Sequence, residues 1–199
     1  MPMSTPIDRR QFAKTTAAAG AAAAVPAGPA TFFGQAPAVR SGGSRPVVVS
    51  SANGNTYKNG GPVTCVQKAF TLITEGADVL DALIAGVNIV ELDPEDTSVG
   101  YGGLPNADGV VQLDASCMHG PTRRAGAVAC LEGVRTPSLV AKAVMEQTDH
   151  HLLVGRDAQT FARNMGFTIE ADLNTENSRR KWLEWKRRVD PEHYLDPAQ

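Results

Sequence analysis

The sequence of 199 residues lacks an excess of charge of either sign. Nineteen lysines and arginines stand against 21 aspartates and glutamates, which gives a formal net charge of −2. Nucleic acid is therefore not an implied partner, because proteins that bind it carry a basic excess. Basic residues cluster only at 179–181 and 186–188, beside Trp182 and Trp185. This pattern predicts the solvated face of an amphipathic helix, with a phosphate-binding patch as the alternative.

Long hydrophobic runs are also missing. A membrane-spanning helix needs about 20 consecutive apolar residues. The best candidate, the Ala/Gly-rich run 15–27, is shorter and rich in alanine. We therefore expect no membrane partner for the mature protein.

The first 38 residues have the order of an export signal rather than of a folded domain. Arg9-Arg10 and Phe12 precede the apolar run, and Ala36-Pro37-Ala38 offers the small residues that a signal peptidase accepts. We expect residues 1–38 to be a twin-arginine signal peptide followed by a linker over 39–44. This predicts a periplasmic or secreted protein. A disordered alanine-rich tail is the alternative.

Cysteine is scarce, with three in the chain: Cys65, Cys117 and Cys130. An odd number leaves at least one thiol outside any disulfide within the chain. In the hairpin predicted below, Cys117 faces about Gly126 and Cys130 faces about Leu113, so these two do not pair across the ladder. We expect all three to be buried apolar thiols, because no base stands beside them in the sequence.

Metal-binding patterns are absent as well. Adjacent residues of a strand point to opposite faces, so His150 and His151 cannot easily share one ion. Asp93, Glu95 and Asp96 lack the twelve-residue pattern of a calcium loop and are interpreted as an acidic turn after a helix. No metal and no cofactor is expected.

A series of strand and helix patterns is present between residues 45 and 199. Apolar spacing, N-caps and Gly/Pro stops predict both element types in alternation. We expect a layered α/β or α+β fold. The predicted elements are a strand at 47–49 with a turn at Asn53-Gly54, a helix from Pro62 to Gly76 with Val63, Val66, Phe70 and Ile73 on its inner face, a helix capped by Asp78 and running to Val90, strands at 110–116 and 125–131, a helix opening at Thr136-Pro137, a strand at 151–154, a helix capped by Asp157, and a helix from Thr175 to Pro191.

The most specific motif is the glycine-rich loop between the helix that runs to Val90 and the strand at 110–116. It reads Ser98-Val99-Gly100-Tyr101-Gly102-Gly103, then Leu104-Pro105-Asn106, and then the strand V-x-L-D-A-S. This order of residues resembles the corresponding motif of the glycosylasparaginase family of N-terminal-nucleophile amidohydrolases. The resemblance continues through 126–132, 141–148 and 151–155 and ends near Phe167.

The resemblance implies a chain fold that is the first half of a four-layer αββα sandwich. It also implies a precursor that cuts itself before a threonine, which then hydrolyses the side-chain amide of an asparagine derivative. No match to the segment that carries this threonine occurs before Gln199, so we expect no catalytic residue in this chain and a nucleophile beyond it. The implied partners are a β-chain segment that begins with threonine, in an (αβ)2 assembly, and a small asparagine derivative. A catalytically dead remnant and a periplasmic small-molecule-binding domain are the alternatives.

Four residues of the chain are candidate site residues. The resemblance places Ser98 near the nucleophilic threonine, whereas by itself it reads as a hydroxyl that caps a turn. Gly102 and Gly103 are interpreted as shape residues that support the site, because no P-loop pattern follows them. Asn53 is expected in the wall of the substrate pocket or in a plain Asn-Gly turn. The family often has a tryptophan there, whereas this chain has Ser51-Ala52-Asn53-Gly54.

Overall fold

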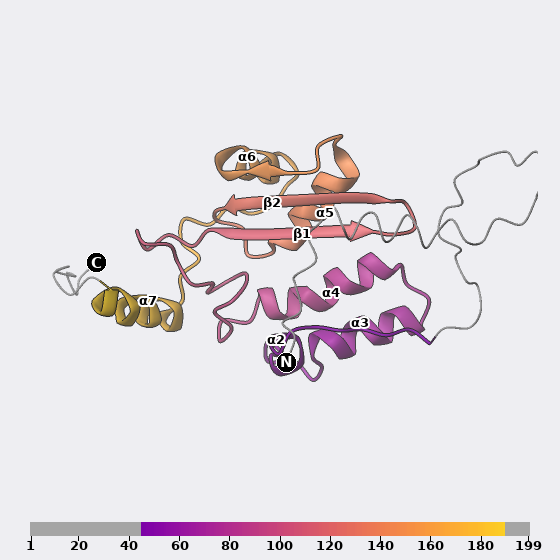
Figure 1. The fold of residues 1–199 in the computed structure, drawn as a ribbon, viewed down its shortest axis with the longest axis horizontal. Coiled ribbons are helices and arrows are strands. Elements are labelled where there is room, and N and C mark those ends of the chain that lie inside the picture. Colours follow the sequence, from indigo (N-terminus) through magenta and orange to yellow (C-terminus); the bar gives the residue numbers. More distant parts are fainter. Residues whose placement is uncertain (1–44, 190–199) are drawn as a thin grey trace, which may run out of the picture. The chain divides into compact units, whose positions relative to one another are not determined.

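The computed structural model describes residues 45–189 and contains a three-stranded mixed sheet (Figure 1). Strand β1 (Leu113–His119) is antiparallel to β2 (Arg124–Leu131), and the short β3 (Leu153–Val154) is parallel to β2. The predicted hairpin and the return strand are therefore confirmed. The hairpin begins three residues later than predicted, at Leu113 rather than Val110.

A bulge in the hairpin changes the surroundings of one cysteine. Cys117 pairs with Gly126 as predicted, but Leu113 pairs with Leu131 rather than with Cys130. Cys130 has φ 49° and donates its backbone N–H to the carboxylate of Asp114 at 2.8 Å. The extra residue turns Cys130 outward, so the prediction of a buried thiol is wrong there. Cys65 is buried and Cys117 is half-buried, and all three thiols are free.

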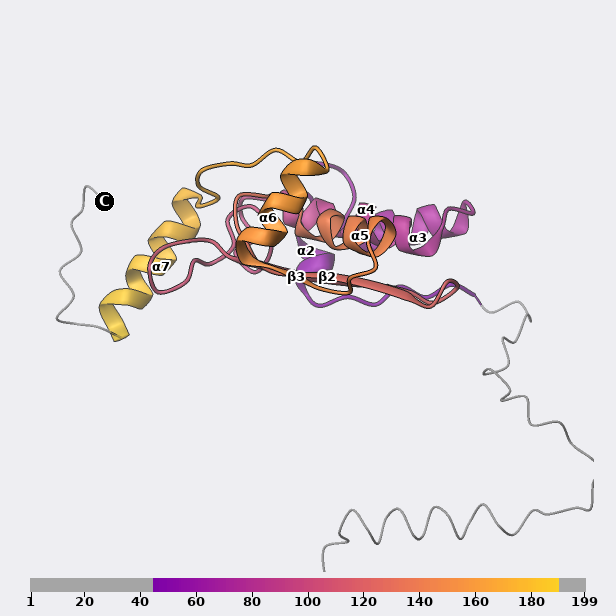
Figure 2. The ribbon, with the colours of Figure 1, turned by 90° about the horizontal axis from the view of Figure 1, so that it is seen from above.

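Helices cover one face of the sheet. Helix α5 (Pro137–Gln147) lies against β1 and β2, and α6 (Gly155–Asn164) lies against β2 and β3 (Figure 2). The α5 backbone approaches closely at Gly126, where an added Cβ would lie 2.6 Å from the backbone nitrogen of Met145. The core between these elements consists of Val128, Leu131, Val134, Val140, Ala141, Val144, Ala158 and Ala162.

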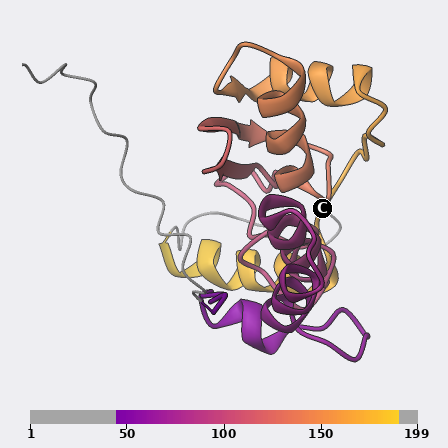
Figure 3. The ribbon, with the colours of Figure 1, turned by 90° about the vertical axis from the view of Figure 1, so that its right-hand side faces the viewer.

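Two further helices form an antiparallel pair beside α5, α3 (Cys65–Thr74) and α4 (Val79–Glu91) (Figure 3). Asp78 caps α4 as predicted, since its carboxylate accepts from the N–H groups of Leu80 and Asp81. Helix α3 begins after Thr64, which forms a capping box with Gln67, so the predicted start at Pro62 is wrong.

The inner face of α3 also differs from the prediction. Small residues face α4, with Cys65 and Ala69 buried against Gly86, whereas Val63 and Phe70 are exposed. Close approach at Gly86, where an added Cβ would lie 3.2 Å from the Ala69 Cβ, selects the small residues of α3 for the contact. The other two residues predicted for the inner face, Val66 and Ile73, are half-buried.

Residues 47–49 do not form the predicted strand. Val47 and Val49 are 79% and 86% exposed, and no described strand lies beside them to complete a ladder. Asn53-Gly54 likewise belongs to the one-turn helix α2 (Asn53–Thr56) rather than to a hairpin turn. The apolar triplet predicts a buried strand, but a strand needs a pairing partner, and none of the described strands pairs with residues 47–49.

Two other caps differ in detail. Helix α6 begins at Gly155 with Val154 as its N-cap, so Asp157 lies in the first turn and does not cap the helix. Thr136 is the N-cap of α5 as predicted, but its side chain makes no capping bond. Helix α7 (Glu176–Val189) packs through Trp182, whose Nε1 donates to the carbonyl of Asn106 at 2.9 Å. Its predicted end at Pro191, and the predicted residues 1–44, lie outside the described residues.

The second face of the sheet carries no helix of the described part of the chain (Figure 2). The large apolar side chains on or beside it are exposed, with Met118 at 75%, Val154 at 49% and Leu152 at 51%. The α/β class is thus confirmed with one sheet and one helical layer, while the four-layer arrangement stays a prediction. Among the described residues, no helix has the length and apolarity to span a membrane.

Candidate functional site

The fold brings together two of the residues predicted from the sequence. Asn53, in α2, donates from Nδ2 to the hydroxyl of Ser98 at 3.0 Å, although 45 positions separate them in the chain. Neither a plain Asn-Gly turn nor a plain turn cap requires this contact. The hydrogen bond joins the start of the domain to the glycine-rich loop.

A buried carboxylate, Asp96, holds Ser98 from the other side. The Asp96 side chain is 3% exposed and accepts from the Ser98 hydroxyl at 2.7 Å through Oδ2 and 3.0 Å through Oδ1. Its Oδ2 also accepts the backbone N–H groups of Ser98 and Val99 at 3.2 and 3.1 Å. This role of Asp96 was not predicted from the sequence. The spacing Asp-x-Ser, which is typical of an Asx-turn, was the available signal.

Asp93, in the same acidic run, orders the turn that precedes Asp96. Its Oδ2 accepts the backbone N–H of Asn59 at 2.6 Å and its Oδ1 accepts that of Glu95 at 3.0 Å. The interpretation of an acidic turn after a helix is therefore confirmed, since the carboxylates bind backbone N–H groups next to the end of α4.

The loop is fixed to the end of α4 at Gly100 and Tyr101. Tyr101 donates its N–H to the carbonyl of Glu91 at 2.7 Å. Gly100 has φ +59°, and an added Cβ would lie 2.6 Å from the carbonyl carbon of Glu91. Glycine is required here for two reasons, the left-handed backbone and the close approach of α4.

Gly102 and Gly103 lie against other parts of the chain. Gly102 donates its N–H to the carbonyl of Leu173 at 2.9 Å and packs on Thr175, while Gly103 packs on Leu113. These contacts agree with a role in loop shape. Neither glycine has Asn53 or Ser98 among its nearest neighbours.

Glu91 forms a second buried polar centre that sequence reasoning missed. Its side chain is 2% exposed and accepts from the backbone N–H of Ser138 at 3.0 Å, the Ser138 hydroxyl at 2.7 Å and the Asn88 amide at 2.6 Å. The carboxylate thus supplies the acceptor at the N-terminus of α5 that Thr136 does not. Burial raises the pKa of Glu91, while the hydrogen bonds from Ser138 and Asn88 act in the opposite direction.

In the part of the chain that the structure describes, no cysteine or histidine side chain makes a hydrogen bond to Asn53, Asp96 or Ser98. Lys181, in contrast, donates to the neighbouring Thr97 hydroxyl at 2.9 Å. Burial raises the pKa of the thiols of Cys65 and Cys117, which opposes formation of a reactive thiolate. His119 lies at the far end of β1 and bonds Asp78 at 3.0 Å and Thr122 at 2.8 Å. Within residues 45–189, no group of three His, Cys, Asp or Glu side chains is placed to hold a metal ion.

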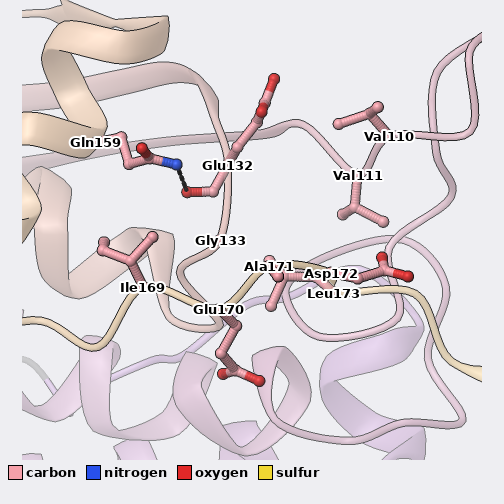
Figure 4. Close-up of a pocket in the computed structure, with 10 residues that line it drawn as sticks. All are labelled: Val110, Val111, Glu132, Gly133, Gln159, Ile169, Glu170, Ala171, Asp172 and Leu173. Atoms are coloured by element: carbon pink, nitrogen blue, oxygen red, sulfur yellow. Dashed lines mark hydrogen bonds between the residues drawn. The ribbon is translucent and has the colours of Figure 1, made fainter.

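A hollow of about 310 Å³ lies at the end of β2 (Figure 4). Glu132 and Glu170 project away from its centre, and Glu170 is held by Arg135 at 2.6 and 2.8 Å. Val111, Ile169 and Leu173 also line it. The hollow shares no lining residue with the Asn53, Ser98 and Asp96 contacts, so it is separate from them.

Comparison with known proteins agrees with the motif. The profile of the family described as Asparaginase matches residues 39–197. An N(4)-(beta-N-acetylglucosaminyl)-L-asparaginase of Elizabethkingia miricola is 42% identical over 142 residues, which is 71% of this chain and 39% of the relative. The mouse protein of the same description is 37% identical over 149 residues, or 75% of this chain and 40% of the relative.

A plant-type L-asparaginase of Pyrococcus abyssi is 46% identical over 110 residues, which is 55% of this chain and 35% of that protein. The chain therefore spans between 35% and 40% of the length of these three relatives. The resemblance found in the glycine-rich loop is confirmed, because the family match covers that loop and all of the described residues. The chain belongs to the asparaginase family.

Proposed function

We propose that this chain is the α-chain part of an amidohydrolase that cleaves the side-chain amide of asparagine or glycosylasparagine to give aspartate. The observation that carries the proposal is the contact between Asn53 and Ser98, within a family motif and a family match that covers residues 39–197. The relatives described above are named for the same chemistry on asparagine side chains.

In this proposal the nucleophile is a threonine that begins a separate β-chain segment. Its α-amino group, with a pKa of about 8 in model peptides, acts as the base for its own hydroxyl. The hydroxyl attacks the amide carbonyl, the amine leaves with a proton, and water then releases aspartate. Donor groups around the carbonyl oxygen stabilise the tetrahedral intermediates. Ser98 and Asn53 contribute a fixed polar wall beside the reacting groups, and Gly102 and Gly103 keep the loop in shape.

The uncovered sheet face supports the partner segment. The exposed Met118 and Val154 lie on the side of the sheet opposite α5 and α6, and small alanines at 125, 127 and 129 lie between them along β2. A second sheet packed there completes the four-layer sandwich and removes this apolar area from water. We propose that the β segment supplies that sheet and that the intact enzyme is an (αβ)2 assembly.

Co-production with a β segment that begins with threonine tests the function. The complex is expected to release aspartate from asparagine or N-acetylglucosaminyl-asparagine, and the purified chain alone is expected to release none. Ser98→Ala in the complex should reduce kcat/KM by at least about tenfold, because a positioned polar group next to the reacting atoms is lost. Turnover by the chain alone, or an inactive but well-folded complex, would contradict the proposal.

We also propose export through the twin-arginine route with cleavage after Ala38, from the order of Arg9-Arg10, the apolar run and Ala36-Pro37-Ala38. Replacing Arg9 and Arg10 by lysine should leave uncleaved protein in the cytoplasm. Fractionation followed by N-terminal sequencing measures both location and cleavage. Unchanged export and processing of the double variant would argue against this route.

A further inference from the structure

The Ser98 hydroxyl has a single proton, and Asp96 receives it. A carboxylate offers only acceptors, so the contact of 2.7 Å between the Ser98 Oγ and the Asp96 Oδ2 requires the hydroxyl to donate. Asp96 is 3% exposed and is fixed further by two backbone N–H groups, those of Ser98 and Val99. The direction of the hydroxyl proton is therefore set by a buried and ordered group.

Asn53 occupies one of the two lone pairs of the same hydroxyl. Its Oδ1 accepts the N–H of Gly54 at 2.8 Å and the hydroxyl of Ser51, which fixes the orientation of the amide. Its Nδ2 then faces Ser98 and donates to Oγ at 3.0 Å. With the proton committed to Asp96 and one lone pair committed to Asn53, the hydroxyl has one lone pair left, and Ser98 is exposed to solvent.

We propose that Asp96 and Asn53 are positioning residues that make Ser98 a hydrogen-bond acceptor and not a donor. Resting on the proposed function, this defines the chemistry that Ser98 recognises: an N–H or ammonium group, rather than the carbonyl or carboxylate oxygen of an asparagine derivative. Ser98 then holds a donor group in place and takes no part in stabilising an oxyanion, which needs donors.

A turn-forming role for Asp96 alone makes a different prediction. An Asx-turn needs only the bonds from Asp96 to the backbone N–H groups of Ser98 and Val99. In that case the acidity of the group at position 98 does not depend on Asp96. The two accounts are therefore separated by measuring that acidity.

The variant Ser98→Cys, combined with Cys130→Ser to remove the exposed thiol, makes the acidity measurable in the full chain co-produced with the β segment. The rate of alkylation at position 98 by iodoacetamide is followed against pH by peptide mass spectrometry. A carboxylate next to the introduced thiol favours the protonated form. Asp96→Asn in this background should therefore speed alkylation at pH 8 by about tenfold, the change that a difference of one in pKa produces.

Asn53→Ala is a second variant, for which the alkylation rate should change in the opposite direction. It removes the donor that stabilises a thiolate at position 98, so alkylation should become slower than in the parent. Unfolding cannot imitate this result, because the chain in urea reacts at the faster rate of a thiol without Asp96 beside it. Asp108→Asn, which changes an exposed carboxylate of the loop before β1, is the matched control and should leave the rate unchanged.

The proposal would be overturned if the alkylation rate had the same pH profile in the parent and in Asp96→Asn. It would also be overturned if Asn53→Ala were alkylated as fast as the parent or faster. The alkylation rate is measured on the co-produced complex without substrate, so it does not depend on turnover. Its failure is therefore distinct from failure of the proposed hydrolase, which the release of aspartate by the complex measures.

Discussion

At the scale of single residues, the family motif owes its shape to contacts with the end of α4. The backbone carbonyl of Glu91 accepts from the N–H of Tyr101, and the Glu91 backbone lies directly against Gly100. The Glu91 side chain accepts from Ser138 and Asn88. Ser98 is two residues from Gly100. A change in the packing of Gly100 on Glu91 should therefore displace the Ser98 hydroxyl that accepts from Asn53. Two substitutions test this connection between loop and helix.

Gly100→Ala should destabilise the fold more than an ordinary left-handed glycine replacement. The added Cβ meets the Glu91 backbone in addition to the strain of φ +59°. Gly76→Ala is the matched control, because Gly76 has φ +91° and open space around it. By urea unfolding of the complex with its partner segment, we expect a loss of about 1–2 kcal/mol for the control and at least about 3 kcal/mol for Gly100→Ala. Equal losses would contradict the close packing.

Glu91→Gln should change how stability depends on pH. Burial raises the pKa of Glu91 above its ordinary value of 4.5, so the folded state binds the proton more tightly than the unfolded chain does. The contribution of this group to stability is therefore full below about pH 4.5 and is lost as the pH rises toward the folded pKa. In thermal melts of the proposed complex from pH 4 upward, the Tm of Glu91→Gln minus the Tm of the parent should increase across this window. A difference independent of pH would refute the assignment.

At the scale of elements, prediction succeeded where the signal is local. The carboxylate of Asp78 caps α4 because its partners, Leu80 and Asp81, are neighbours in the sequence. The hairpin pairs Cys117 with Gly126 because the turn between the two strands sets the register. Information of this kind is present in a few consecutive residues.

Prediction failed where the outcome depends on distant partners. The inner face of α3 depends on Gly86 of α4, against which Cys65 and Ala69 pack, whereas Phe70 is exposed. In the site, Ser98 and Asn53 were identified singly, but their hydrogen bond depends on how α2 lies against the loop. Asp96 was missed as a ligand of Ser98 because an acid after a helix is also a common turn residue.

Gly126→Ala tests the packing of α5 on the sheet. An added Cβ would lie 2.6 Å from the Met145 nitrogen and 2.7 Å from the Met145 Cβ, so helix and strand must separate. We expect a loss of about 1–3 kcal/mol in the free energy of unfolding. Gly120→Ala, in the hairpin turn with nothing within 4 Å, should stay within about 0.5 kcal/mol. Equal urea midpoints for the two variants would argue against the tight contact.

At the scale of the whole described domain, one sheet carries helices on one face only. The core lies between that face and α5 and α6, while Met118 and Val154 remain exposed on the other. Each large apolar side chain that a partner buries on this face stabilises the complex by about 1.5–3 kcal/mol relative to the exposed side chain. The same exposure makes the chain alone prone to association. Under the proposed function, both folding and activity depend on a partner that covers this face.

Sedimentation velocity of residues 39–199, with and without the β segment, tests this dependence most directly. The chain alone should sediment as heterogeneous aggregates and bind a dye for apolar surface, whereas the co-produced complex should give one compact species without dye binding. Met118→Ser with Val154→Thr should reduce the association of the chain alone, since these side chains are exposed on the uncovered face. A monodisperse chain that melts sharply and binds no dye would contradict the account.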